Sequence, residues 1–86
     1  MAFEDTWADI ERYAGEVFYR LGGQSFTYEV YPDHLKFPNA DQPLPKSALE
    51  QACASGRPAT VTQLKQLGLP SPSQVFAILT DPRIRV

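Results

Sequence analysis

The chain has only one cysteine, Cys53, among its 86 residues, so it cannot form an internal disulfide bond. This scarcity excludes the small secreted domains that disulfides hold together, and it predicts a reducing, cytoplasmic location. The chain also lacks any apolar run approaching the ~20 residues that a bilayer-spanning helix needs, so no membrane partner is expected. Its acidic beginning, MAFEDTWADIE, differs from a signal peptide, which starts with basic and then apolar residues.

Residues that carry out catalysis or bind metals are equally scarce. The one histidine, His34, has no second histidine or cysteine pair that could complete a metal site. Cys53 lies on a predicted apolar stripe with Leu49 and Ala52, which indicates a buried, unreactive thiol rather than a nucleophile. No glycine-rich loop precedes a helix in the manner of a phosphate-binding site. We therefore expect a non-catalytic protein with no cofactor, no metal and no catalytic residues.

What the chain does contain is typical of a small globular domain. Hydrophobic residues make up 43% and charged residues 21%, and 86 residues suffice for one core. Eight prolines against five glycines indicate stiff connections. We predict a single α+β domain over residues 1–86, with an N-terminal helix, a β-hairpin, three short helices and a third strand at the C-terminus.

The first predicted element is a helix that begins at the N-cap residue Thr6 and ends at Gly22–Gly23. Its polar face is expected to be solvated and to carry a Glu16–Arg20 pair at i,i+4 spacing. Its apolar residues recur at three- and four-residue spacing, at Trp7, Ile10, Ala14, Val17, Phe18 and Leu21.

The next element is a hairpin. Alternating aromatic and β-branched residues over 26–31 predict a half-buried strand, Pro32–Asp33 predicts a turn, and 35–37 predicts the returning strand. The prolines that follow predict a rigid connection to the helical half of the chain.

Three short helices are predicted in the remainder. Each opens with a capping-box sequence, beginning at Ser47, Thr60 and Ser71, although the first helix could also start at Pro45. Residues 83–86 alternate and are expected to add a strand to the hairpin. The predicted core consists of Trp7, Ile10, Val17, Phe18, Leu21, Phe26, Tyr28, Val30, Leu35, Leu49, Leu64, Leu67, Val75, Phe76, Ile78 and Leu79.

The segment over 60–80 resembles a helix-turn-helix, because two short helices are joined by Gly68-Leu69-Pro70 and their apolar spacing packs them together. This resemblance implies that the second helix reads nucleic acid through Ser71, Ser73 and Gln74. The basic side chains implied to contact the phosphate backbone are those of Lys65, Arg57, Arg83 and Arg85. The segment departs from the pattern because its second helix carries no Lys or Arg, so two ordinary core helices are the alternative.

Charge is unevenly distributed along the chain. Residues 1–45 hold eight acids and three bases, whereas residues 46–86 hold five bases and two acids. The basic second half is consistent with an anionic ligand, and the acidic first half with a basic partner. Duplex DNA is therefore the favoured ligand by a small margin.

The alternative is a protein–protein interaction module or a homodimer. It would use an acidic helix face and the aromatic side chains of Tyr13, Tyr19 and Tyr31. Tyrosine is enriched at interfaces because it combines apolar area with a polar tip.

Overall fold

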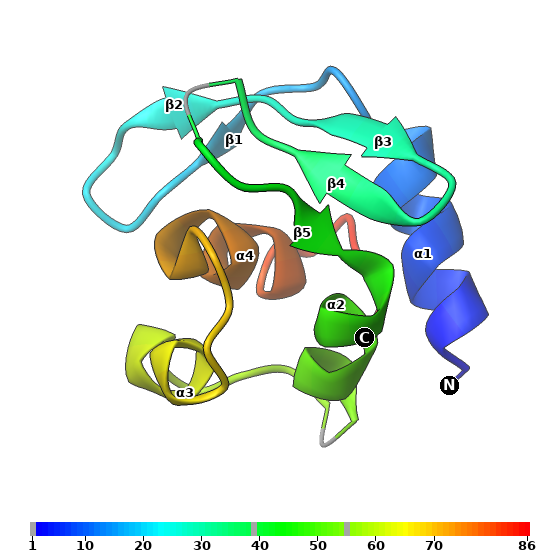
Figure 1. The fold of residues 1–86 in the computed structure, drawn as a ribbon. Helices are drawn as coiled ribbons and strands as arrows, with labels where there is room; N and C mark the ends of the chain where they lie inside the picture. Colours follow the sequence, from blue (N-terminus) through cyan, green and yellow to red (C-terminus); the bar gives the residue numbers. More distant parts are fainter. Residues whose placement is uncertain (1, 39, 55) are drawn as a thin grey trace.

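Two small antiparallel sheets lie above a layer of helices, with α1 at one side (Figure 1). This arrangement is an α+β fold, as the sequence predicts. The computed structural model describes residues 2–38, 40–54 and 56–86. The elements in chain order are α1 (Phe3–Arg12), β1 (Phe18–Tyr19), β2 (Ser25–Phe26), β3 (Glu29–Tyr31), β4 (His34–Lys36), β5 (Leu44–Pro45), α2 (Lys46–Cys53), α3 (Val61–Gln66) and α4 (Pro72–Leu79).

The larger sheet has the order β3-β4-β5, and its β3–β4 hairpin turns at Pro32–Asp33 as predicted. The third strand is β5, which no sequence pattern indicated. The strand predicted over 83–86 is wrong, because those described residues form no strand. The backbone N–H of Arg85 instead donates to the Asp9 carboxylate, so a side chain holds the C-terminal tail.

The first helix is shorter than predicted. It ends at Arg12, and its N-cap is Ala2, so the predicted N-cap Thr6 is instead a buried residue within the helix. Gly15 has φ +87°, a left-handed conformation that a helix cannot continue through. The chain then turns and becomes extended at β1, so the predicted helical pair of Glu16 with Arg20 does not form.

The smaller sheet is a hairpin of β1 and β2, paired as Phe18↔Phe26 and Tyr19↔Ser25. An aromatic cluster joins it to the larger sheet. The Phe18 ring lies 5.4 Å from the Tyr28 ring, and the Phe26 ring lies 6.0 Å from the Phe37 ring, measured between centroids. These contacts fix the hairpin above α4.

Only one of the three predicted capping boxes forms. At α3 the Thr60 side chain accepts from the Gln63 backbone, and the Gln63 side chain accepts from the Thr60 backbone. Helix α2 begins at Lys46, with Pro45 as its N-cap, rather than at a Ser47 cap. Ser71 is the N-cap of α4 as predicted, but its φ of 51° is left-handed and its side chain makes no cap hydrogen bond.

Most of the predicted core is buried, but three of its members are exposed. Val17 is 44% exposed, Leu21 80% and Leu67 53%. In a strand alternate side chains point to opposite faces, so the inward Phe18 places Val17 outward. Leu67 lies past the end of α3, next to Gly68. The buried apolar residues that the pattern missed include Phe37, Leu44 and Ile84.

Candidate functional site

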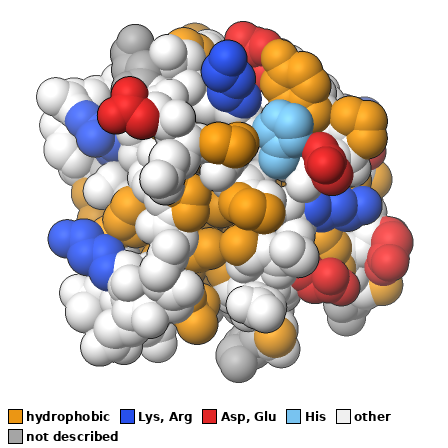
Figure 2. Space-filling model, viewed as in Figure 1, with side chains coloured by type: hydrophobic (Ala, Val, Ile, Leu, Met, Phe, Trp, Pro, Cys, Tyr) orange, Lys and Arg blue, Asp and Glu red, His pale blue; other side chains and the backbone are white. Residues whose placement is uncertain are grey.

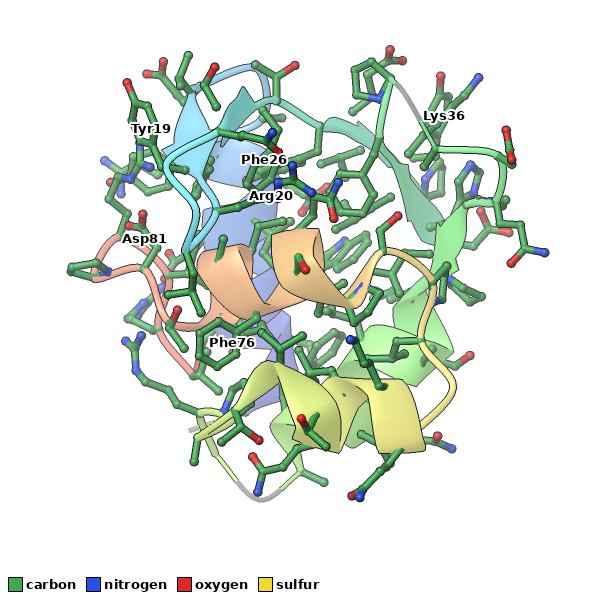
Figure 3. The ribbon with its side chains drawn as sticks, turned by 90° about the vertical axis from the view of Figure 1, so that its left-hand side faces the viewer. Tyr19, Arg20, Phe26, Lys36, Phe76 and Asp81 are labelled. Atoms are coloured by element: carbon green, nitrogen blue, oxygen red, sulfur yellow. The ribbon has the colours of Figure 1, made fainter. Side chains whose placement is uncertain are left out.

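Two neighbouring hollows lie where the β1–β2 hairpin meets the first turn of α4. The smaller, of about 120 Å³, is lined by Arg20, Leu21, Gly22, Gln24, Val61 and Ser73. The larger, of about 210 Å³, is lined by Val17, Ser25, Phe26, Thr27, Phe37, Pro38 and Gln74. We call these residues together the hairpin–helix surface. Figure 3 looks onto it, with Arg20 and Phe26 above α4 and Tyr19 projecting outward at the hairpin.

The hairpin that forms one wall of this surface has a tight loop. The Arg20 backbone N–H donates to the Gln24 carbonyl at 2.9 Å, and the Gly23 N–H donates to the Arg20 carbonyl at 2.8 Å. Gly23 has φ +87°, which fits a three-residue hairpin loop whose last residue is left-handed. Gly22–Gly23 was predicted to end a helix, and that interpretation is wrong because the pair closes this hairpin instead.

The outer edge of β2 pairs with no strand among the described residues. Because Arg20 and Gln24 form a hydrogen-bonded pair, the alternation of an antiparallel ladder points the backbone groups of Ser25 away from β1. Thr27 follows β2 directly, and the same alternation continued by one residue gives its backbone groups the same direction. Within residues 2–38, 40–54 and 56–86, no other backbone or side-chain group hydrogen-bonds to those groups. Both residues line the larger hollow. Among the described residues these backbone donors and acceptors have no partner, and they lie beside a groove that Phe37 and Pro38 also line.

The groove beside β2 is lined by uncharged residues. Its lining combines apolar side chains with hydroxyl groups and one amide, and no charged residue takes part. The smaller hollow adds one cation, Arg20, and no carboxylate. A surface of this composition suits a ligand that offers backbone hydrogen bonds and apolar side chains.

Two of the three residues predicted to read nucleic acid, Ser73 and Gln74, lie at this surface, whereas Ser71 lines neither hollow. Ser73 lines the smaller hollow and Gln74 the larger, facing the hairpin in both cases. Ser71, Ser73 and Gln74 are all partly buried. The hairpin therefore stands beside the turn that a groove-reading helix would insert into DNA.

The predicted phosphate contacts do not converge on α4. Arg57 donates to the carbonyl oxygens of Leu79, Asp81 and Ile84, at 3.2, 3.2 and 2.8 Å. These carbonyl oxygens lie at and beyond the end of α4, where no following helical turn supplies a donor. The Arg57 guanidinium supplies the missing hydrogen bonds. Lys65 is exposed on α3 and does not line either hollow.

The other two arginines are bound to carboxylates. Arg83 pairs with Asp81 at 3.0 Å, donates to the Val17 carbonyl at 3.1 Å, and lies over the Phe18 ring. Arg85 pairs with Asp9 at 2.8 Å. These hydrogen bonds lower the pKa of both carboxyl groups and raise the pKa of both guanidinium groups. Both arginines therefore hold the C-terminal tail in place.

The tyrosines predicted to contact a partner lie in different surroundings. Tyr13 is partly buried, with the guanidinium groups of Arg12 and Arg83 over its ring. Tyr31 stacks on His34 with 4.6 Å between ring centroids, and it donates to Glu29. Tyr19 is 65% exposed and makes no ring stacking, cation–π contact or side-chain hydrogen bond with another described residue.

Side chains that could bind a metal ion are not gathered in the part of the chain that the structure covers. No three His, Cys, Asp or Glu side chains among residues 2–38, 40–54 and 56–86 are placed to hold a metal ion. Cys53 is partly rather than fully buried, and burial raises the pKa of its thiol to about 11. His34 bonds to Asp33 at 2.6 Å on the exposed hairpin turn, which lowers the pKa of that aspartate. None of the described helices is long and apolar enough to cross a membrane.

A larger hollow, of about 550 Å³, lies between α1, the β3–β4 turn and α2. The side chains of Glu4, Asp33 and Glu50 are exposed at its rim. Its one base, Lys46, lies 5.0 Å from the centre of the Trp7 ring. This is an ordinary solvated acidic surface. The hydrophobic side chains visible in Figure 2 gather elsewhere, at the centre of the face shown.

The sequence pattern did not point to most of the hairpin–helix surface, and the polar side chains that it missed are those of Arg20, Gln24, Ser25 and Thr27. A signal for them existed, because Gly22–Gly23 between two runs of alternating residues is a hairpin pattern. Comparison of the chain with protein-family models, curated proteins and solved structures found no match.

Proposed function

We propose that this protein is a non-catalytic protein-binding module that takes an extended peptide segment along the outer edge of β2. The observation that carries this proposal is the open backbone of Ser25 and Thr27 beside the groove. A peptide strand added there would satisfy those backbone groups, and its alternate side chains would enter the groove. A cytoplasmic location belongs to the same proposal, since the lone Cys53 has no partner for an internal disulfide.

The lining of the groove supports a peptide over a polyanion. Phe26, Phe37 and Pro38 offer apolar contact area, while Gln74 offers an amide that can bond to a peptide backbone. No lysine or arginine lines this groove, although phosphate contacts supply much of the affinity for nucleic acid.

Duplex DNA remains the competing hypothesis. Its expected backbone contacts Arg57, Arg83 and Arg85 would each give up an internal partner to bind phosphate. Lys65 and Arg20 are the bases near α4 that make neither an ion pair nor a side-chain hydrogen bond within the described part of the chain. This leaves little cationic surface for a phosphate backbone.

The test uses a random decapeptide library displayed on phage and two variants at one position. Thr27→Pro removes the outward N–H and places a ring on the edge, whereas Thr27→Ala keeps the N–H and serves as the matched control. We expect Thr27→Ala, which trims a side chain that lines the groove, to change the affinity of enriched peptides by only a few fold. Thr27→Pro should lower the affinity about tenfold or more below that of Thr27→Ala, as the loss of a buried hydrogen bond and a clash would cause. Thermal melting of each variant reports whether the fold is kept.

Three outcomes would count against the proposal. One is the absence of any enriched peptide, and another is unchanged binding to folded Thr27→Pro. The third is tight, strongly salt-dependent binding to a mixed-sequence duplex that weakens in Lys65→Ala, which would favour nucleic acid. Dimerisation that Tyr19→Ala abolishes, with no peptide bound, would instead make a second copy of the chain the partner.

A further inference from the structure

Five of the eight lysines and arginines of this protein bind or cover another group, and Arg20 is the one of the other three that is partly buried. Arg83 and Arg85 bind carboxylates, and Arg57 binds carbonyl oxygens. Arg12 lies over the Tyr13 ring and Lys46 over the Trp7 ring. The bases without such a contact among the described residues are Arg20, Lys36 and Lys65, of which the two lysines are exposed.

Arg20 lies in a hollow where an anion would fit. The hollow at the hairpin tip contains no carboxylate, and its other polar side chains are Gln24 and Ser73, which can both donate hydrogen bonds. No buried side-chain nitrogen among the described residues lacks a hydrogen-bond partner, so the unpaired guanidinium of Arg20 is in contact with water and can exchange that water for a ligand. A planar carboxylate matches the fork of its N–H groups.

The direction of a bound peptide follows from the hairpin. Chain direction in β2 runs away from the loop over 21–23, so a strand antiparallel to β2 would finish at that loop. A strand parallel to β2 would instead begin at the loop and bring its terminal ammonium group to Arg20. The repulsion between these two positive charges disfavours that direction. Antiparallel pairing is also the slightly more stable arrangement.

We propose that the segment bound at β2 is the free C-terminus of a partner protein, with its terminal carboxylate held by Arg20 in the hollow at the hairpin tip. This inference rests on the peptide-binding function proposed above. Leu21 and Val61 also line that hollow, so the last side chain of the partner is apolar. Gln24 and Ser73 supply further donors to the carboxylate.

The experiment uses peptides with free C-termini, selected by display, and synthesised in two forms. One form keeps the terminal carboxylate and the other is amidated, and fluorescence polarisation at pH 7 measures the affinity of each. We expect amidation to weaken binding to the wild type by about tenfold or more, the effect of losing a charge-assisted hydrogen bond. In Arg20→Gln the two forms should bind about equally, both near the affinity of the amidated form for the wild type.

Two further variants make the result specific. Arg20→Lys keeps the charge without the fork and should retain part of the preference for the free acid. Lys65→Gln removes a base that does not line the hollow and should leave both affinities unchanged. Melting curves report whether each variant folds. If Arg20→Gln does not fold, a reduced preference for the free acid in Arg20→Lys tests the inference in its place.

The outcomes separate this inference from the proposed function. Equal binding of the acid and amide forms to the wild type would overturn the inference and leave peptide binding intact. A preference for the acid form that persists in both Arg20 variants would also overturn it. Failure of every peptide to bind would overturn the proposed function, and this inference with it.

Discussion

Asp9 lies on α1 but is bound by the C-terminal tail, 76 residues further along the chain. Its carboxylate accepts from the Arg85 Nε at 2.8 Å, from Nη2 at 3.0 Å and from the backbone N–H at 3.0 Å. The side chain of Asp9 is 9% exposed, whereas that of Arg85 is 53% exposed. Asp9→Ala therefore removes a buried acceptor that satisfies three donors.

We expect Asp9→Ala to lower the free energy of unfolding by about 2 kcal/mol at pH 7. Hydrogen bonds to a charged group contribute about 1.5–3 kcal/mol, and the exposed Arg85 can recover hydration, which places the net loss in the lower part of that range. For a domain of this size, the loss corresponds to a melting temperature about 8–16 °C lower. Urea unfolding followed by circular dichroism would measure it.

The same substitution has a characteristic dependence on pH. The Arg85 hydrogen bonds hold the pKa of Asp9 below its ordinary value. The stabilisation is therefore fully present above the pKa of an unfolded aspartate, about 3.9, and is lost as pH falls through the lower pKa of the folded state. The stability difference between the wild type and Asp9→Ala should shrink as the pH falls to about 2.

A double-mutant cycle with Arg85→Ala isolates the pair. We expect Arg85→Ala alone to cost less stability than Asp9→Ala, because the backbone N–H still donates to Asp9, and the double variant to cost less than the sum of the two. Unchanged melting of Asp9→Ala at pH 7, or a loss that persists at pH 2, would refute this account of the tail.

Three further predictions follow from single positions. Gly68 has φ +77° with no atom near the place of a Cβ, so Gly68→Val should cost about 1–2 kcal/mol in thermal unfolding through backbone strain alone, whereas Gly22→Ala, where φ is not left-handed, should cost less. The Cys53 thiol, with its pKa raised to about 11, should react with Ellman's reagent at pH 8 more than tenfold slower than the urea-unfolded chain, and equal rates would contradict its burial. The buried Tyr28 hydroxyl donates to the Ile10 carbonyl at 2.7 Å, so Tyr28→Phe should cost about 1–2 kcal/mol in urea unfolding, and an unchanged midpoint would contradict the role of that bond.

The candidate site could be predicted only in part. Ser73 and Gln74 were identified because they open an amphipathic helix, which is a local property of the sequence. Arg20, Ser25 and Thr27 were not, because helical and strand patterns compete over 16–21. The spacing of the apolar residues Val17, Phe18 and Leu21 fits one face of a helix. The same residues also fit a strand in which buried and exposed side chains alternate.

Local sequence by itself determined several features of the fold. The Pro32–Asp33 turn, the Thr60 capping box and the left-handed Gly68 each depend on backbone preferences within a few residues. The burial of Val75, Ile78 and Leu79 follows from helical spacing in the same way.

Tertiary structure decided the features whose partners lie far apart in the chain. The end of α1 depends on Tyr28, whose carbonyl accepts from the Gly15 N–H. Strand β5 forms because β4 offers an edge for Leu44 to pair with. The tail over 83–86 has the alternation of a strand, yet the Asp9 carboxylate binds it instead, because hydrogen bonds to a buried charge are stronger than those a short edge strand could form. Such choices depend on which groups meet in space, which no window of sequence contains.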